Sequence, residues 1–162
     1  MGKERAMARG WRMLTVGRPK DKRVTQLIDD YRQRLTPWMP VQWDSVTEIG
    51  YRSGQELETQ EREGRLLLDK ILPSDWVIIL DIMGQSLNSV DLSAKMAHYY
   101  DQSLPVVFVV GGSLGLSARI KDRANWRWSL SPLTLPHALA QLLVMEQIYR
   151  AFSIIHHHPY HK

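Results

Sequence analysis

Two loops of this chain contain the residue types and spacings that most clearly indicate chemistry. Five apolar residues, Val106 to Val110, predict a strand buried on both faces; it ends at Gly111-Gly112, and Gly115 follows. Glycines at such a turn permit positive φ and let a ligand approach the bare backbone. The second loop, Ser131-Pro132-Leu133-Thr134-Leu135-Pro136, is stiffened by its two prolines. We expect both loops to leave the ends of neighbouring strands.

The side chains around these loops predict a pocket for a flat, weakly charged molecule. Leu80 and Asp81 end another predicted strand, and Leu130 to Leu135 would form a further wall. Ligands of open α/β sheets bind outside the carboxyl ends of the strands, and apolar walls with free backbone groups suit a base such as adenine. Neither GxGxxG after the first strand nor GxxxxGK[ST] is present, which argues against dinucleotide and triphosphate sites. Taken alone, GGSLG is better explained as a tight strand-to-helix turn than as a ligand site.

Strands and helices alternate along the chain, and this order positions the two loops. The predicted strands are 11–16, 41–47, 76–80, 106–110 and 126–130. The predicted helices are 21–35, 56–72, 89–102, 117–125 and 137–155. The alternation predicts an α/β fold with a mostly parallel sheet flanked by helices. We expect the glutamates of 56–72 on a solvated face, and Ser89 as a helix cap.

Length and composition indicate one globular domain with a basic end. The 162 residues predict a single domain at 11–162, preceded by a flexible extension at 1–10. No secretion signal or membrane-length apolar run is apparent, so we expect a cytoplasmic protein with no membrane partner. Cysteine is absent, which excludes disulfides and thiolate metal sites. Residues 1–37 hold ten Lys/Arg against four Asp/Glu, which indicates a polyanionic partner or a solvated tail.

Several segments in fixed order carry a resemblance to a known family. They are VVGGSLGLS, WSLSPLTLPHALA, EQIYRAFSI and the ending HPYHK. From about Arg12 to Lys162 the chain resembles the RlmH-type family, the SPOUT-class methyltransferases of bacterial large-subunit ribosomal RNA. The resemblance implies a SPOUT-type fold with a C-terminal trefoil knot, and a homodimer. It also implies that S-adenosylmethionine binds in a bent shape at Leu80, Gly111, Leu130, Ser131, Pro132, Leu133, Thr134 and Leu135.

The implied reaction is methyl transfer to N3 of a pseudouridine in 23S ribosomal RNA, within an assembled ribosome. A ring N–H must lose its proton, so a base or a water path is needed, and His137, Tyr160 and His161 are candidates. Arg150 would hold a phosphate or the carbonyl of the base. Each residue has another interpretation: His137 as a helix cap, the tail residues as RNA contacts only, and Arg150 as part of an ion pair.

Two other functions are compatible with the same sequence. One is a non-catalytic RNA-binding or ribosome-binding module that has kept the fold, and the other is a different α/β nucleotide-binding enzyme. The apolar helix predicted at 137–155 fits a dimer interface, although a helix buried in a monomer would show the same pattern. The run His156 to His158 has no cysteine or acidic ligand nearby, and we expect no metal site there.

Overall fold

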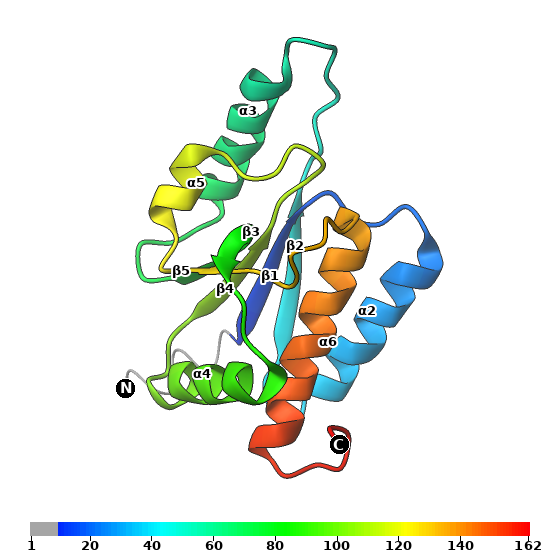
Figure 1. Cartoon of the computed structure of the whole chain (residues 1–162), viewed down its shortest axis with the longest axis vertical. Coiled ribbons are helices and arrows are strands. Elements are labelled where there is room, and N and C mark those ends of the chain that lie inside the picture. The colour runs from blue at the N-terminus through cyan, green and yellow to red at the C-terminus, as the bar shows by residue number, and fades with distance from the viewer. Residues whose placement is uncertain (1–9) are drawn as a thin grey trace.

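A computed structural model describes residues 10–162, and the predicted flexible extension lies almost entirely outside this part of the chain. Five strands form one sheet in the order β2-β1-β4-β3-β5, with every neighbouring pair parallel. The strands are β1 (Trp11–Val16), β2 (Val41–Val46), β3 (Trp76–Gln85), β4 (Val106–Val110) and β5 (Trp126–Trp128). The helices are α2 (Lys22–Leu35), α3 (Glu56–Asp69), α4 (Ser89–Asp101), α5 (Ala118–Arg123) and α6 (His137–Ile155). The α/β class is confirmed, and the sheet is wholly parallel (Figure 1).

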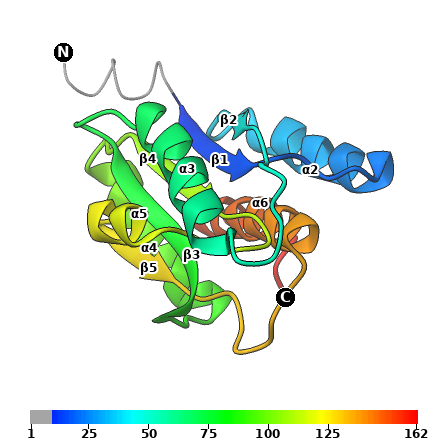
Figure 2. The same ribbon diagram turned by 90° about the horizontal axis from the view of Figure 1, so that it is seen from above.

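Alternation of side chains along the strands divides the core into two layers. Trp11 and Met13 of β1 and Phe108 of β4 pack into the layer that is covered by α2, α4 and α6. Their sequence neighbours, such as Leu14 and Val109, pack into the layer covered by α3 and α5. Both faces of the sheet are therefore buried, as a fully apolar parallel strand requires. Figure 2 shows the two groups of helices on opposite sides of the sheet.

Several predicted boundaries differ from the structure. Asn88, and not Ser89, caps α4, because the Asn88 side chain accepts a hydrogen bond from Asp91 N at 2.8 Å. The Ser89 hydroxyl instead donates to Gln147 Oε1 on α6 at 2.9 Å. Helix α3 ends at Asp69, three residues before its predicted end at Leu72.

Helix α6 has the length and composition of a membrane span, in contrast to the expectation that no such segment is present. It is 19 residues long, and 44% of its most apolar 18-residue window is buried inside the protein. Val144, Met145, Ile148 and Phe152 are almost completely buried, and the helix packs between α2 and α4 against the sheet. The apolar character of α6 is therefore that of a core helix.

Candidate functional site

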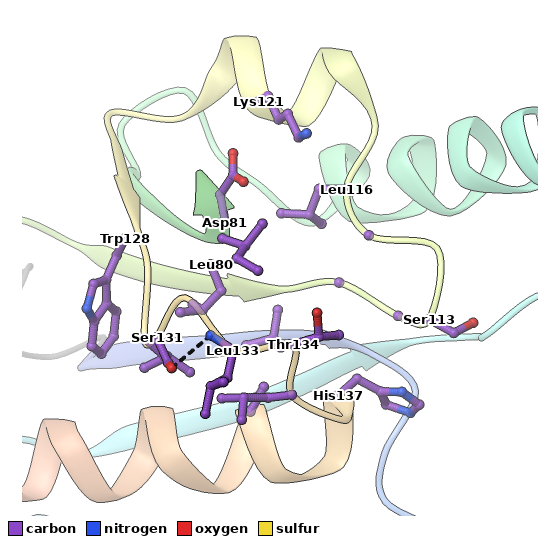
Figure 3. A pocket seen from close by; sticks show the side chains of 18 residues that line it. Leu80, Asp81, Ser113, Leu116, Lys121, Trp128, Ser131, Leu133, Thr134 and His137 are labelled. Atoms are coloured by element: carbon purple, nitrogen blue, oxygen red, sulfur yellow. Dashed lines mark hydrogen bonds between the residues drawn. The ribbon is translucent and has the colours of Figure 1, made fainter. Parts of the chain in front are cut away.

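A cavity of about 350 Å³ opens where β3, β4 and β5 reach the carboxyl edge of the sheet. Its walls come from the end of β3, the glycine-rich loop 111–116, helix α5, the proline loop 131–136 and the start of α6 (Figure 3). This volume lies in the range of small-molecule sites. The predicted position of a pocket outside the carboxyl ends of the strands is confirmed.

Seven of the eight residues predicted to contact a cofactor line this cavity. They are Leu80, Gly111, Leu130, Ser131, Leu133, Thr134 and Leu135. Pro132 is exposed and does not line it. The proline loop is held by its serines, since Ser131 Oγ accepts from Leu133 N at 3.0 Å and Ser129 Oγ donates to the Ser131 carbonyl at 3.2 Å. Leu133 is left largely exposed at the rim of the cavity.

The glycines of the first loop serve different purposes. Gly115 alone among them has a positive φ, of 74°, and its N–H donates to Gly112 O at 3.0 Å to close the turn. Gly111 is needed for close packing, because a Cβ there would lie 3.1 Å from Leu116 and from the Gly115 backbone. The predicted positive φ is therefore confirmed only at Gly115.

Strand β3 continues five residues beyond its predicted end at Leu80 and forms one wall of the cavity. Its pairing with β5 shifts register between Leu80 and Gln85, both of which pair with Trp128. Gly84 permits this course, since a Cβ there would lie 2.6 Å from the carbonyl oxygen of Arg127. Asp81 thus belongs to the strand, and its Oδ1 accepts from Met83 N at 3.0 Å.

Helix α3 supports the glycine-rich loop from behind, which the sequence analysis did not predict. Gln60 Nε2 donates to the Leu114 carbonyl at 2.7 Å. Gly64 lets α5 approach, because a Cβ at this position would lie 2.3 Å from Ser117 Oγ. A helical spacing of four residues places both on one face of α3. This spacing was present in the sequence, but nothing there indicated which loop it would meet.

Glu63 contradicts the prediction that the glutamates of α3 are solvated. Its side chain is buried and its Oε2 accepts from Ile49 N at 3.0 Å. Burial raises the pKa of Glu63, with the Ile49 N–H and the nearby His137 acting in the opposite direction. Glu63 also lies beside Gly112, so its carboxyl group contacts both the loop after β2 and the glycine-rich loop that lines the cavity.

The predicted catalytic residues form a second cluster, near the C-terminal end of α6. Tyr160 donates to Glu146 Oε1 at 3.0 Å and shares a hydrogen bond of 3.2 Å with the Tyr31 hydroxyl. Arg150 pairs with Glu146 at 2.6 Å and lies 4.7 Å from the centre of the Tyr160 ring. It also contacts His161 Nδ1 at 3.2 Å. The four residues around Glu146 are thereby held in one hydrogen-bonded network.

This network limits the proton chemistry of the tail. Burial, the hydroxyl of Tyr31 and the carboxylate of Glu146 all raise the pKa of Tyr160, so its phenol keeps its proton at neutral pH. Arginine can only donate, so Nδ1 of His161 is the acceptor in its contact with Arg150. As arranged here, the Tyr160 hydroxyl donates to Glu146, and the Nδ1 lone pair of His161 becomes available to a proton only if His161 leaves Arg150.

Within one chain, the tail cluster and the cavity lie at opposite ends of α6. His137 lines the cavity at the first position of the helix, while Arg150 follows thirteen residues later. At 1.5 Å per residue the two positions are about 20 Å apart along the helix. Within one chain, the tail therefore lies far along α6 from the cavity.

Three other histidines lie outside the hydrogen-bonded network around Glu146. His137 does not cap α6 with its side chain, because the N-cap is Pro136 and no side-chain capping bond forms. The ring of His137 points away from Trp128 and the inner end of the cavity (Figure 3). His156 stacks on Trp38 at 5.0 Å, and His158 meets the edge of the same ring at 5.5 Å.

Two of the four basic residues that follow β1 are already engaged. The guanidinium of Arg18 lies 4.2 Å from the centre of the Trp43 ring and donates to the Trp43 carbonyl at 2.7 Å. Arg23 pairs with Asp21 at 2.8 Å. Lys20 and Lys22 are exposed at the same edge of the sheet as the cavity. All four side chains are exposed, so the turn presents its positive charge to solvent, with Arg23 beside the carboxylate of Asp21.

Residues 10–161, nearly the whole described chain, match the family described as "Predicted SPOUT methyltransferase". The chain belongs to the SPOUT methyltransferase family. A member of this family from Desulforamulus reducens, named "Ribosomal RNA large subunit methyltransferase H", is 37% identical over 155 residues; the match covers 93% of this chain and 97% of the relative. A protein of the same name from Xylella fastidiosa is 36% identical over 140 residues, with coverage of 86% and 89%.

The fold of this SPOUT chain is also found in a solved structure. The structure of a "Probable Methyltransferase" from Bordetella pertussis Tohama I aligns with a TM-score of 0.51. The alignment covers 93% of this chain and 99% of that one, at 14% sequence identity. At this identity the likeness shows a common fold and nothing about the reaction.

Proposed function

We propose that this protein is an RlmH-type methyltransferase that uses S-adenosylmethionine to methylate 23S ribosomal RNA. The observation that carries the proposal is the near-full-length similarity, at 36–37% identity, to relatives named ribosomal RNA large subunit methyltransferase H. The family match over residues 10–161 spans the segments that form the cavity loops and the tail. A non-catalytic module of the same fold would have no need for an open cofactor cavity.

The cavity fits S-adenosylmethionine in size and in the chemistry of its walls. Leucines from three segments and the Trp128 ring provide an apolar slot, while the glycine-rich and proline loops present backbone donors and acceptors for the edge of adenine. Asp81 Oδ2 is buried without a hydrogen-bond partner in the described part of the chain, which favours a ligand with a donor group. When bound, the cofactor supplies an activated methyl group.

The residues of the chain have to align the target base and manage one proton. For transfer to N3 of a pseudouridine, we propose that Arg150 and Tyr160 bind and orient the base or its phosphate by donating hydrogen bonds. His161 would accept the ring proton once the RNA displaces it from Arg150. The raised pKa of Tyr160 makes the phenol unsuitable as the base.

Pairing of two chains would join the separated parts of the site. Leu139 and Leu143 on α6 are exposed by 44% and 38%, so an apolar strip of this core helix remains uncovered. If two α6 helices pack antiparallel about a twofold axis, the tail of one chain comes close to the cavity of the other. We therefore propose a homodimer in which each site combines the cavity of one protomer with the tail of its partner.

Three further expectations from the sequence are part of this proposal. The C-terminal trefoil knot, an assembled ribosome as substrate and a cytoplasmic location all belong to this group. Among them, the ribosome bears on function most directly, because the chain is one small domain and must recognise a large, shaped RNA with its own surface.

Methylation of ribosomes that lack the modification tests the proposed function. Purified protein, labelled S-adenosylmethionine and large subunits or whole ribosomes from a deletion strain should give label in 23S RNA, and mass mapping should place it on a pseudouridine. Calorimetry with S-adenosylmethionine alone should show binding. A protein that binds ribosomes but not the cofactor would be the non-catalytic module.

A further inference from the structure

Only three side chains among those lining the cavity can carry a charge. Asp81 comes from β3, Lys121 from α5 and His137 from the start of α6. Figure 3 shows Asp81 and Lys121 on the same side of the cavity, above Leu116, with His137 on the other side. The rest of the wall is apolar, hydroxyl-bearing or bare backbone. Charged parts of a ligand would therefore be recognised mainly on the side of β3 and α5.

Asp81 and Lys121 both have free bonding capacity toward this side. Asp81 Oδ1 is used by Met83 N, whereas Oδ2 is buried with no partner among the described residues. No carboxylate of the described chain lies within 4.0 Å of the Lys121 ammonium, and that includes Asp81. A buried carboxylate oxygen without a partner is costly, so a donor that entered the cavity beside it would be stabilised.

We propose that Asp81 and Lys121 bind the amino-acid end of S-adenosylmethionine, with Asp81 opposite its ammonium group and Lys121 opposite its carboxylate. The proposal rests on the proposed function and assigns the orientation of the cofactor within the cavity. A ligand end that carries one positive and one negative group satisfies both side chains at once. Ribose hydroxyls could donate to Asp81 and accept from Lys121, but they carry no charge, and the zwitterionic amino-acid end matches both side chains better.

The adenosine part then lies against the apolar and backbone walls. Figure 3 shows the Trp128 ring away from Lys121 and Asp81, and Leu130 and Leu135 add further apolar lining to the cavity. An uncharged base loses little hydration free energy when it leaves water for such a slot, whereas a zwitterion requires ionic or hydrogen-bond partners. The division of the cavity into a charged and an uncharged side thus corresponds to the two ends of the cofactor.

Three small molecules separate this proposal from its alternatives. S-adenosylhomocysteine carries both charged groups of the amino-acid end, decarboxylated S-adenosylmethionine keeps the ammonium and its sulfonium but lacks the carboxylate, and 5′-methylthioadenosine has none of these charges. Asp81→Asn keeps the shape of the side chain and the acceptor for Met83 N. Lys121→Gln keeps part of the aliphatic stem. Exposed residues of α5 supply matched controls, Asp122→Asn and Arg119→Gln.

Dissociation constants come from calorimetry, or from displacement of labelled S-adenosylmethionine where binding is weak, with circular dichroism to verify the fold. Asp81→Asn should weaken the binding of S-adenosylhomocysteine and of decarboxylated S-adenosylmethionine by about tenfold or more, as expected for the loss of a charge-assisted hydrogen bond. It should change the affinity for 5′-methylthioadenosine by less than about threefold. Lys121→Gln should weaken only the binding of S-adenosylhomocysteine. The two control variants should bind all three ligands with unchanged affinity.

Other results would overturn the assignment in distinguishable ways. An equal loss for all three ligands in Asp81→Asn would assign the carboxylate to the ribose or to the shape of the cavity. Unchanged affinity for S-adenosylhomocysteine in either variant would remove that residue from the subsite. Failure of the unmodified protein to bind S-adenosylmethionine or S-adenosylhomocysteine would contradict the proposed function itself.

Discussion

Glu63 shows how one buried carboxyl group ties the stability of this protein to pH. It accepts a hydrogen bond from Ile49 N, yet burial raises its pKa above the usual value for a glutamate. The folded state therefore binds the proton of Glu63 more tightly than the unfolded chain does. The contribution of this group to stability is largest below the ordinary glutamate pKa, and it is lost as the pH rises through the raised value.

Replacing Glu63 by Gln should remove this pH dependence and keep an acceptor for Ile49 N. We expect Glu63→Gln to gain stability relative to the unmodified protein as the pH rises from about 4 to 8, because ionisation of a buried carboxyl opposes folding. Urea unfolding across this range measures the difference. Glu61→Gln, at an exposed position on the same helix, is the matched control. A stability difference that stays constant with pH would contradict the interpretation.

At the scale of elements, contact between α3 and α5 holds the glycine-rich loop in place. Gly64→Ala should destabilise the fold by about 1–3 kcal/mol, the usual cost of overpacking, since its Cβ would lie 2.3 Å from Ser117 Oγ. Thermal unfolding of Gly64→Ala, Ser117→Ala and the double variant tests the contact. The double variant should be more stable than the sum of the two single effects predicts. Strict additivity would mean that the two helices adjust without contact between these residues.

For the whole molecule, the separation of cavity and tail predicts complementation between two inactive chains. Gly111→Val should disable the cavity, because the new side chain collides with Leu116 and the Gly115 backbone. Deletion of residues 159–162 should remove the tail and leave cofactor binding within a few-fold. A dimer with one chain of each kind retains one complete site if tails act across the interface. Its activity should be roughly half that of the unmodified dimer.

Co-expression with two different affinity tags isolates the mixed dimer, and single-turnover methylation of unmodified ribosomes measures its activity. Dimers that carry the same change in both chains are the controls. The tail deletion should lower activity by on the order of a hundredfold, the scale of one lost acid–base group, and Gly111→Val should lose activity because it no longer binds the cofactor. An inactive mixed dimer would show that the tail serves the cavity of its own chain. A monomer mass by light scattering at working concentrations would contradict the dimer.

Salt dependence should reveal which surface meets RNA. Lys20 and Lys22 are exposed at the edge of the sheet that holds the cavity, whereas Arg18 and Arg23 are occupied by Trp43 and Asp21. Lys20→Gln with Lys22→Gln should lower the slope of log affinity against log salt by about one to two units. Lys70→Gln, beyond the C-terminal end of α3, should leave the slope unchanged. An unchanged slope in the double variant would make the basic turn a solvated surface.

The sequence by itself determined the element order, the parallel class of the sheet and most of the cavity wall. Apolar β-branched runs such as Val106 to Val110 favour buried strands, and strands that alternate with helices favour a parallel sheet, in which the loops after the strands meet at one edge. Glycine and proline punctuate those loops by local backbone restrictions that do not depend on the rest of the chain.

Tertiary structure alone decided which distant side chains meet. The sequence pattern of α3 could not show that Glu63 would be buried beneath the glycine-rich loop, or that Gln60 would hold the Leu114 carbonyl. It also could not show that the tail folds back onto Glu146, far along α6 from the cavity. Local patterns report periodicity and backbone preference, whereas burial and hydrogen-bond partners depend on how whole elements pack against one another.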